Sequence, residues 1–157
     1  QIMDARKFIS FKPSAFIFPQ QVLVRAERVG MEHFIRAILE NIAFAIRANI
    51  ETIKDVLGRL PDRITVTGGL TKSELWLRII SDVLGTKIIV PRIIESSSLG
   101  CAMCALVGVG EYKNLEDAAR AVTSIIREIE PEEANRRAYT QYYSRWKKLY
   151  PKMDTLF

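Results

Sequence analysis

The sequence predicts an α/β domain in which parallel strands are joined by crossover helices. Between residues 31 and 107, segments with helical periodicity alternate with short runs of β-branched residues. Glycine or proline marks most of the boundaries between these segments. Such alternation is typical of parallel strands whose connections cross over the sheet. Two more helical segments follow, so we expect extra helices at the C-terminal end.

The composition is that of an ordinary globular protein. The 157 residues are 48% hydrophobic and 26% charged, and we expect residues 1–157 to form one domain. The 23 basic and 18 acidic residues give a net charge of +5. The basic residues are scattered, apart from adjacent pairs such as Arg136-Arg137 and Lys147-Lys148 in the last helical segment. This pattern favours a solvated helix face over a nucleic-acid-binding patch.

The sequence contains no signal for membrane insertion or secretion. No apolar run approaches the roughly 20 residues of a membrane span, and the first residues lack a signal-peptide pattern. The two cysteines, Cys101 and Cys104, indicate a reducing compartment, so we expect a cytoplasmic protein. We interpret this Cys-x-x-Cys as small-residue packing, because a zinc site needs two more ligands and His33 is distant in sequence.

The N-terminal half begins with short candidate elements and continues with one long helix. Candidates for short strands are Phe8–Phe11, Ala15–Phe18 and Leu23–Ala26. From Met31 onward, apolar residues recur every three or four positions and predict an amphipathic helix that ends near Gly58. The stripe consists of Ile35, Ile38, Leu39, Ile42, Ala45, Ile46, Asn49, Ile53 and Val56.

A strand, a Gly-Gly pair and a helix follow the long helix. Ile64–Thr67 alternates and is β-branched, which predicts a strand. Thr71 and Glu74 have the spacing of a capping box, with a hydroxyl at the helix start and a carboxylate three residues later. We therefore predict a helix from about Lys72 to Leu84, ended by Gly85.

The remaining elements are one strand and three helices. Lys87–Val90 reads as a second strand, and Ser96–Ser98 offer N-caps for a very apolar helix over Leu99–Val107. Asn114 is a candidate N-cap, and we predict a helix from there to about residue 127. Pro131 favours the first turn of a helix, so we predict that the last helix begins there.

The segment with the clearest chemical meaning is the Gly68-Gly69 pair between the first strand and its helix. Two glycines let a ligand approach the backbone, and the helix start offers free N–H groups. Ligands of open α/β sheets bind at the carboxyl ends of strands, where this pair lies. The same pattern also fits a plain tight turn, and the residues alone leave both interpretations open. The spacing matches neither a Walker loop nor a dinucleotide-binding loop.

Residues 64–76, Ile-Thr-Val-Thr-Gly-Gly-Leu-Thr-Lys-Ser-Glu-Leu-Trp, resemble the adenosine motif of the FGGY family of carbohydrate kinases. Further segments resemble other motifs of that family and follow in the same order. These segments are His33–Glu40, Ser81–Gly85, Ile89–Pro91 and Glu95–Ala102. Within the family, the segments Phe8–Phe16, Leu39–Asn41 and Leu99–Ala102 and the aromatic tail are similar to kinases of the quorum signal autoinducer, and Glu95–Ser97 is similar to gluconate kinases.

The resemblance implies the actin-like, ribonuclease-H-like ATPase fold, with this chain as the C-terminal lobe and ATP bound between two lobes. Carried over to this sequence, Gly68 and Gly69 line the nucleotide, Leu70 flanks the adenine, and Ser73 bonds its polar edge. We assign Thr71 and Glu74 to helix capping, and Trp76 and Asp82 to packing and structural bonding.

The resemblance also implies a function for the whole protein, which is transfer of the γ-phosphate of ATP to a sugar or polyol hydroxyl. In the family, the catalytic aspartate and the sugar-contacting residues lie in the N-terminal half, and ATP and Mg²⁺ are shared between the lobes. We therefore expect this chain to hold no catalytic residue and no metal ligand of its own, to be inactive alone, and to partner the N-terminal lobe or form a homodimer. The alternatives are a lobe of another actin-like ATPase and a non-catalytic oligomerisation or regulatory module.

Two further patterns have a structural and a functional interpretation. The aromatic residues of the last helix could stack on nucleic acid, but we favour a role in docking that helix. They are Tyr139, Tyr142, Tyr143, Trp146 and Tyr150. His33 stands at a helix start, where capping or exposure is favoured over catalysis.

Overall fold

The computed structural model describes residues 30–59 and 61–154, so the candidate strands near the N-terminus lie outside the described residues. The chain forms two compact units. Of the described residues, unit 1 contains 30–59 and 137–154, and unit 2 contains 61–136.

Unit 1 is a pair of helices. α1 spans Met31–Leu57, and α5 spans Glu133–Asp154, with its first turn belonging to unit 2. α1 ends where the sequence predicts, because Gly58 adopts φ 74° and its N–H donates to the Lys54 carbonyl. At the other end, His33 Nδ1 accepts from the Gly30 N–H at 3.1 Å, which confirms its predicted capping role.

Aromatic rings join α1 to α5. Phe44 is 7% exposed, and its ring centroid lies 6.1, 5.9 and 6.0 Å from those of Tyr139, Tyr143 and Trp146. These distances are within the usual range of aromatic pairs. The predicted docking role of the aromatic stripe is confirmed for these three residues, while Tyr142 is 52% exposed.

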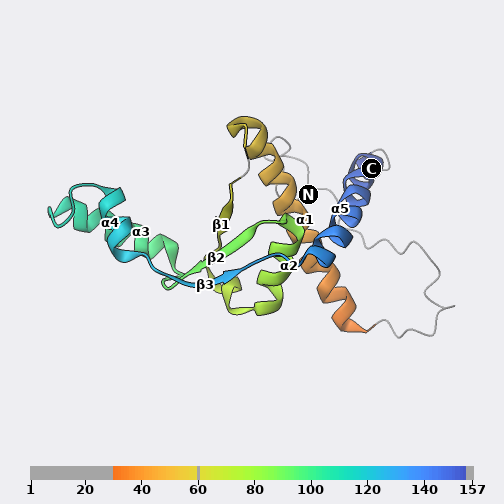
Figure 1. The fold of residues 1–157 in the computed structure, drawn as a ribbon, viewed down its shortest axis with the longest axis horizontal. Coiled ribbons are helices and arrows are strands. Elements are labelled where there is room, and N and C mark those ends of the chain that lie inside the picture. Colours follow the sequence, from red (N-terminus) through yellow and green to blue (C-terminus); the bar gives the residue numbers. More distant parts are fainter. Residues whose placement is uncertain (1–29, 60, 155–157) are drawn as a thin grey trace. The chain divides into compact units, whose positions relative to one another are not determined.

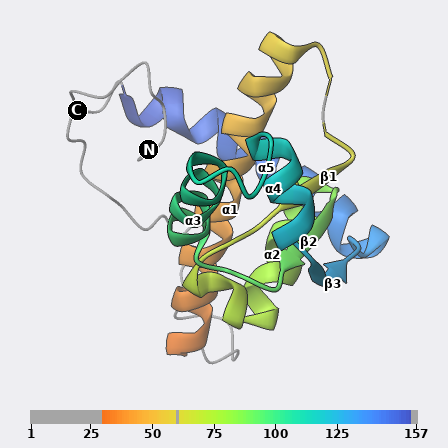
Figure 2. The same ribbon diagram turned by 90° about the vertical axis from the view of Figure 1, so that its left-hand side faces the viewer.

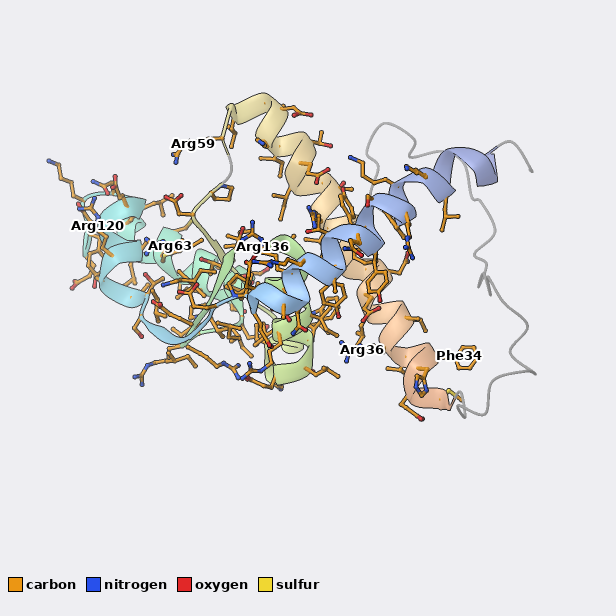
Figure 3. All side chains as sticks on the ribbon, turned by 45° about the vertical axis from the view of Figure 1, so that its right-hand side comes forward. Phe34, Arg36, Arg59, Arg63, Arg120 and Arg136 are labelled. Carbon is orange, nitrogen blue, oxygen red and sulfur yellow. The ribbon has the colours of Figure 1, made fainter. Side chains whose placement is uncertain are left out.

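Hydrogen bonds surround the rings that join α1 to α5. The Tyr139 hydroxyl donates to Glu40 at 2.8 Å and accepts from Arg36, which is labelled in Figure 3, at 3.0 Å. The Tyr143 hydroxyl donates to Glu51 at 2.8 Å. The indole of Trp146 donates to the Asn41 side chain at 2.8 Å. The polar atoms of Tyr139, Tyr143 and Trp146 therefore each have a hydrogen-bond partner on α1.

Unit 2 is a three-stranded sheet with helices between its strands (Figure 1). Its elements are β1 (Arg63–Thr65), η2 (Gly69–Lys72), α2 (Glu74–Leu84), β2 (Lys87–Pro91), α3 (Ser96–Gly108), α4 (Leu115–Val122) and β3 (Ile125–Ile129). The strand order is β1-β2-β3. Figure 2 shows α3 and α4 side by side, at one end of the sheet.

The sheet confirms the predicted parallel pair and adds a strand that the sequence did not predict. β1 and β2 are parallel, with Ile64 opposite Ile88. β3 is antiparallel to β2, with Glu128 opposite Ile89. The predicted helix over residues 114–127 is therefore too long: it ends at Val122, and the chain then pairs with β2.

α2 and the sheet form the core of unit 2. Most residues of α2 are buried. The Ser81 hydroxyl of this helix donates a hydrogen bond to the Ile129 carbonyl on β3. The buried apolar residues of this unit are Trp76, Leu77, Ile79, Ile80, Val83, Ile88, Ile89, Val90, Ala118 and Ile129. Removal of this apolar surface from water is the main stabilising term for the unit.

The helix ends follow the predictions with small shifts. α2 begins at residue 74 rather than 72, and α5 begins at Glu133, two residues after Pro131. Asn114 caps α4 as predicted, because its side chain accepts from the Asp117 N–H at 2.9 Å. Ser96–Ser98 lie inside the first turn of α3 rather than capping it, and the N-cap is Glu95.

Among the described residues, the helices are too short or too polar to cross a membrane.

Candidate functional site

The strongest candidate for a ligand site is the turn between β1 and α2. Gly68 adopts φ 88° and ψ −179°, a conformation that favours glycine. Its N–H donates to the Ile94 carbonyl at 2.8 Å, and the Thr67 hydroxyl donates to the Ser96 hydroxyl at 3.3 Å. These bonds tie the end of β1 to the segment after β2. The turn therefore lies at the carboxyl edge of the two parallel strands, where ligands bind in open α/β sheets.

The turn continues into a short 3-10 helix, η2, that the sequence did not predict. Thr71 is 2% exposed, and its N–H and hydroxyl donate to the Gly68 carbonyl at 3.1 and 2.7 Å. Ser73 is the N-cap of α2, because its Oγ accepts from the Trp76 N–H at 3.2 Å. The predicted capping role of Thr71 is wrong, since the extra turn moves the helix start to residue 74.

Glu74 also differs from its predicted role. A capping-box carboxylate bonds the backbone at the helix start, but Glu74 bonds Arg78 at 3.1 Å and Arg127 at 3.0 Å. Trp76 and Asp82 are buried, and the Asp82 carboxylate accepts hydrogen bonds from the start of α5. The packing role of Trp76 and the structural role of Asp82 are therefore confirmed.

The four residues expected to contact a nucleotide lie within this turn, and three of them, Gly69, Leu70 and Ser73, are exposed. A Cβ placed on Gly68 or Gly69 would meet no atom within 4 Å, so their backbone faces open space. The Leu70 side chain is 59% exposed, and Ser73 is exposed as well. A hydroxyl that accepts from Trp76 keeps its own proton to donate. The turn thus offers bare backbone, an apolar side chain and a hydroxyl donor to a ligand.

A cavity of about 490 Å³ opens beside the turn. Its lining residues come from all three strands, from α3 and from the segments that follow or precede them, and they are Arg63, Thr65, Thr67, Ile89, Pro91, Ile93, Ser96, Leu99, Met103, Thr123, Ser124 and Ile125. Gly68, Gly69, Leu70 and Ser73 do not line it. The sequence did not point to this cavity, although alternate residues of β1 share one face, which is the signal that could have revealed it.

α3 does not show the packing that was predicted for its two cysteines. It is an apolar helix, yet it contains no buried residue. Cys101 and Cys104 are free and exposed, so the packing role predicted for them is wrong for this chain. The described residues contain no group of three or more His, Cys, Asp or Glu side chains that could hold a metal ion.

Residues 21–109 match the model of the C-terminal domain of the FGGY family of carbohydrate kinases, which is more than half of the chain. The chain belongs to this family. Among its relatives, the autoinducer-2 kinase of Salmonella typhimurium is 32% identical over 124 residues, which are 79% of this chain and 23% of that protein. The glycerol kinase of Saccharolobus islandicus is 38% identical over 117 residues, 73% of this chain and 23% of the relative.

Solved structures of sugar kinases show the same fold as this FGGY domain. A xylulose kinase from Brucella ovis matches with a TM-score of 0.73 and 28% identity over 85% of this chain and 27% of that one. The glycerol kinase of Plasmodium falciparum, solved with ADP, matches with a TM-score of 0.63 and 26% identity over 77% of this chain and 24% of the other. The predicted actin-like ATPase fold is confirmed. The chain spans about a quarter of the length of these relatives.

Proposed function

We propose that this chain supplies the adenosine-binding part of an ATP-dependent kinase, which transfers the γ-phosphate of ATP to a hydroxyl of a sugar or polyol. The observation that carries the proposal is the open Gly68-Gly69 turn at the carboxyl edge of β1 and β2. Beyond the adjacent residues, no atom lies within 4 Å of the place where a Cβ would stand on either glycine. The side chain of any other residue would occupy this space, which is open to a ligand here.

The residues of the turn fit a nucleotide chemically. The backbone of Gly68 and Gly69 can approach a ribose or phosphate oxygen closely, because no side chain intervenes. The exposed Leu70 side chain offers an apolar surface for one face of an adenine. Ser73 can donate to a ring nitrogen while it still caps α2.

In this proposal the chain positions the nucleotide and supplies none of the groups that make or break bonds. Bound ATP supplies the phosphoryl group, and Mg²⁺ on its phosphates offsets charge that develops during transfer. We propose that the general base, the sugar-binding residues and any protein ligands of Mg²⁺ lie in the N-terminal lobe of the longer kinase. We also propose a cytoplasmic location, since ATP is an intracellular substrate.

We also propose that polypeptide of the longer kinase covers α3 and the neighbouring cavity. α3 is apolar but buries no residue, and the matched part of this chain covers only 23% and 27% of the two relatives. Exposed apolar surface of this kind marks an interaction site. Cys101 and Cys104 report on it: both thiols should react rapidly with a maleimide in this chain and slowly in the full-length kinase. Equal reactivity in the two proteins would contradict the covering.

The nucleotide proposal is tested by an amide NMR titration of the chain with Mg-ADP. We expect shifts centred on Gly68, Gly69 and Ser73, and we expect Gly69→Val to abolish them while the fold stays intact. Gly100→Val is the matched control, because a Cβ on this glycine of α3 also meets no atom within 4 Å. Absence of these shifts at millimolar nucleotide, both alone and with the N-terminal half added, favours a plain turn and a non-catalytic module.

A further inference from the structure

The turn of the proposed nucleotide site is held from a distance by Arg127 on β3. The Arg127 guanidinium donates through Nη2 to the Thr71 carbonyl at 2.6 Å and through Nη1 to the Glu74 carboxylate at 3.0 Å. Thr71 lies in η2 and Glu74 is the first residue of α2. One side chain thus joins both segments that follow the glycine pair, across 56 and 53 positions of sequence.

The position of Arg127 on β3 directs its side chain toward this turn. β3 pairs with β2 so that Arg127 lies opposite Val90, and side chains alternate between the two faces of the sheet. Ile129, two residues later, is 7% exposed and its carbonyl bonds Ser81 of α2. Arg127 and Ile129 therefore share the face of the sheet that α2 covers. Glu128 points to the opposite face, where it accepts a hydrogen bond from Lys87.

The turn has two long-range anchors, one at each end. At its start, the Gly68 N–H donates to the Ile94 carbonyl at 2.8 Å. At its end, Arg127 bonds the carbonyl of Thr71, a residue that is 2% exposed. Gly69 and Leu70 lie between these anchors and face solvent. The backbone offered to a ligand is thus fixed at both ends.

Arginine suits this place better than lysine does. Its planar fork makes two bonds in fixed directions, whereas the ammonium of lysine acts as a point charge on a flexible stem. The ion pair with Glu74 is partly exposed, at 36% and 51%, and such pairs alone contribute little to stability. The bond to the Thr71 carbonyl distinguishes Arg127 from a surface ion pair.

We propose that Arg127 is a positioning residue for the nucleotide turn, which it holds in the shape that presents Gly69 and Leu70 to adenosine. This inference rests on the proposed function. It names β3, a strand outside the Gly-Gly motif, as part of the site.

The test compares Arg127→Gln, Arg127→Lys and Glu74→Gln with a control, Arg120→Gln. Arg120, labelled in Figure 3, forms an exposed ion pair with Glu116 on α4 and bonds no turn. The first readout needs no ligand: it is amide hydrogen exchange at Thr71 and Ser73, whose N–H groups close the turn on the carbonyls of Gly68 and Leu70. The second readout is the dissociation constant for Mg-ADP, and the third is the melting temperature.

We expect Arg127→Gln to raise both exchange rates roughly tenfold and to weaken Mg-ADP binding by a similar factor, with little change in melting temperature. Arg127→Lys should recover part of both losses. Glu74→Gln should have a small effect, because the bond to Thr71 remains, and Arg120→Gln should have none.

Unchanged exchange at Thr71 and Ser73 in Arg127→Gln would overturn the inference, as would faster exchange spread evenly over unit 2. If the unmodified chain does not bind Mg-ADP, the proposed function fails, but the exchange comparison still decides whether Arg127 orders the turn. The two failures are therefore distinguishable.

Discussion

The Asn135 side chain donates to the Asp82 carboxylate at 2.9 Å, and the Glu132 N–H donates to the same carboxylate at 2.7 Å. Asp82 lies in the last turn of α2 and is 6% exposed. It therefore holds the first turn of α5, where free N–H groups favour a negative charge. A carboxylate used in this way connects two helices and is not available to a substrate.

Asp82→Ala should lower the free energy of unfolding by about 1–3 kcal/mol, because it removes the acceptor of two partly buried hydrogen bonds, one of them from a backbone N–H. Chemical denaturation of the variant and of the unmodified chain measures this difference. Asp55→Ala is the control, since Asp55 is an exposed residue of α1. A loss no larger than that of the control would contradict the structural role of Asp82.

The two glycines of the turn should respond differently to alanine. Gly68 has φ 88° and ψ −179°, which a residue with a Cβ adopts at a cost of about 1–3 kcal/mol. Gly69 does not have a positive φ, and a Cβ added to it would lie more than 4 Å from any atom beyond the adjacent residues. We expect Gly68→Ala to destabilise the chain and Gly69→Ala to leave its melting temperature unchanged. Equal melting temperatures for the two variants would disprove the difference in strain.

Local patterns were sufficient to predict much of this fold. α1 follows from its apolar stripe and from Gly58, and β1 and β2 follow from short β-branched runs between glycine and proline. The Gly68-Gly69 turn is also local, and the structure places it at the predicted edge of the sheet. In each case the residues that decide the conformation lie within a few positions of one another.

What the sequence did not reveal depends on distant contacts. β3 contains two charged residues and follows directly after a helix, so its pattern continues that of α4. It becomes a strand because Glu128 and Arg127 pair with Ile89 and Val90, which no local signal reports. No local pattern points to Arg127 either, because its partner Thr71 lies 56 positions earlier in the sequence.

The helix pair of unit 1 should depend on Phe44. This residue is 7% exposed and contacts three aromatic rings of α5, so Phe44→Ala should cost about 3–5 kcal/mol, as large truncations in a core do. Near-ultraviolet circular dichroism should lose the signal of the ordered Trp146 and Tyr143 rings. Met31→Ala, at a position that is 72% exposed, serves as the control and should change neither quantity.

Acid should weaken the pairing of α1 with α5 through Glu51. Burial alone raises the pKa of this carboxyl, but hydrogen bonds from Tyr143 and Lys147 and the charge of Arg47 outweigh it and lower the pKa below its ordinary 4.5. A lowered folded-state pKa contributes stability that is complete above the unfolded pKa and is lost as pH falls through the folded one.

We therefore expect the chain to lose stability below pH 4.5 more steeply than Glu51→Gln, in which the amide oxygen still accepts from Tyr143. Urea unfolding at neutral pH and at progressively lower pH measures the difference. Parallel curves for the two proteins would show that Glu51 is not a source of acid sensitivity. Asp55→Asn serves as the control for the removal of one acidic residue.

At high pH the same helix pair should respond through Tyr139. Burial and the hydrogen bond to Glu40 raise the pKa of its hydroxyl from 10.0 to about 12, although Arg36 opposes the shift. A raised pKa contributes stability that is complete below the unfolded pKa and is lost as pH rises through the folded one. Stability from Tyr139 should thus persist to pH 10 and disappear near pH 12. Absorbance of tyrosinate follows the titration, and Tyr139→Phe should remove one late step, whereas Tyr142→Phe should leave that step in place.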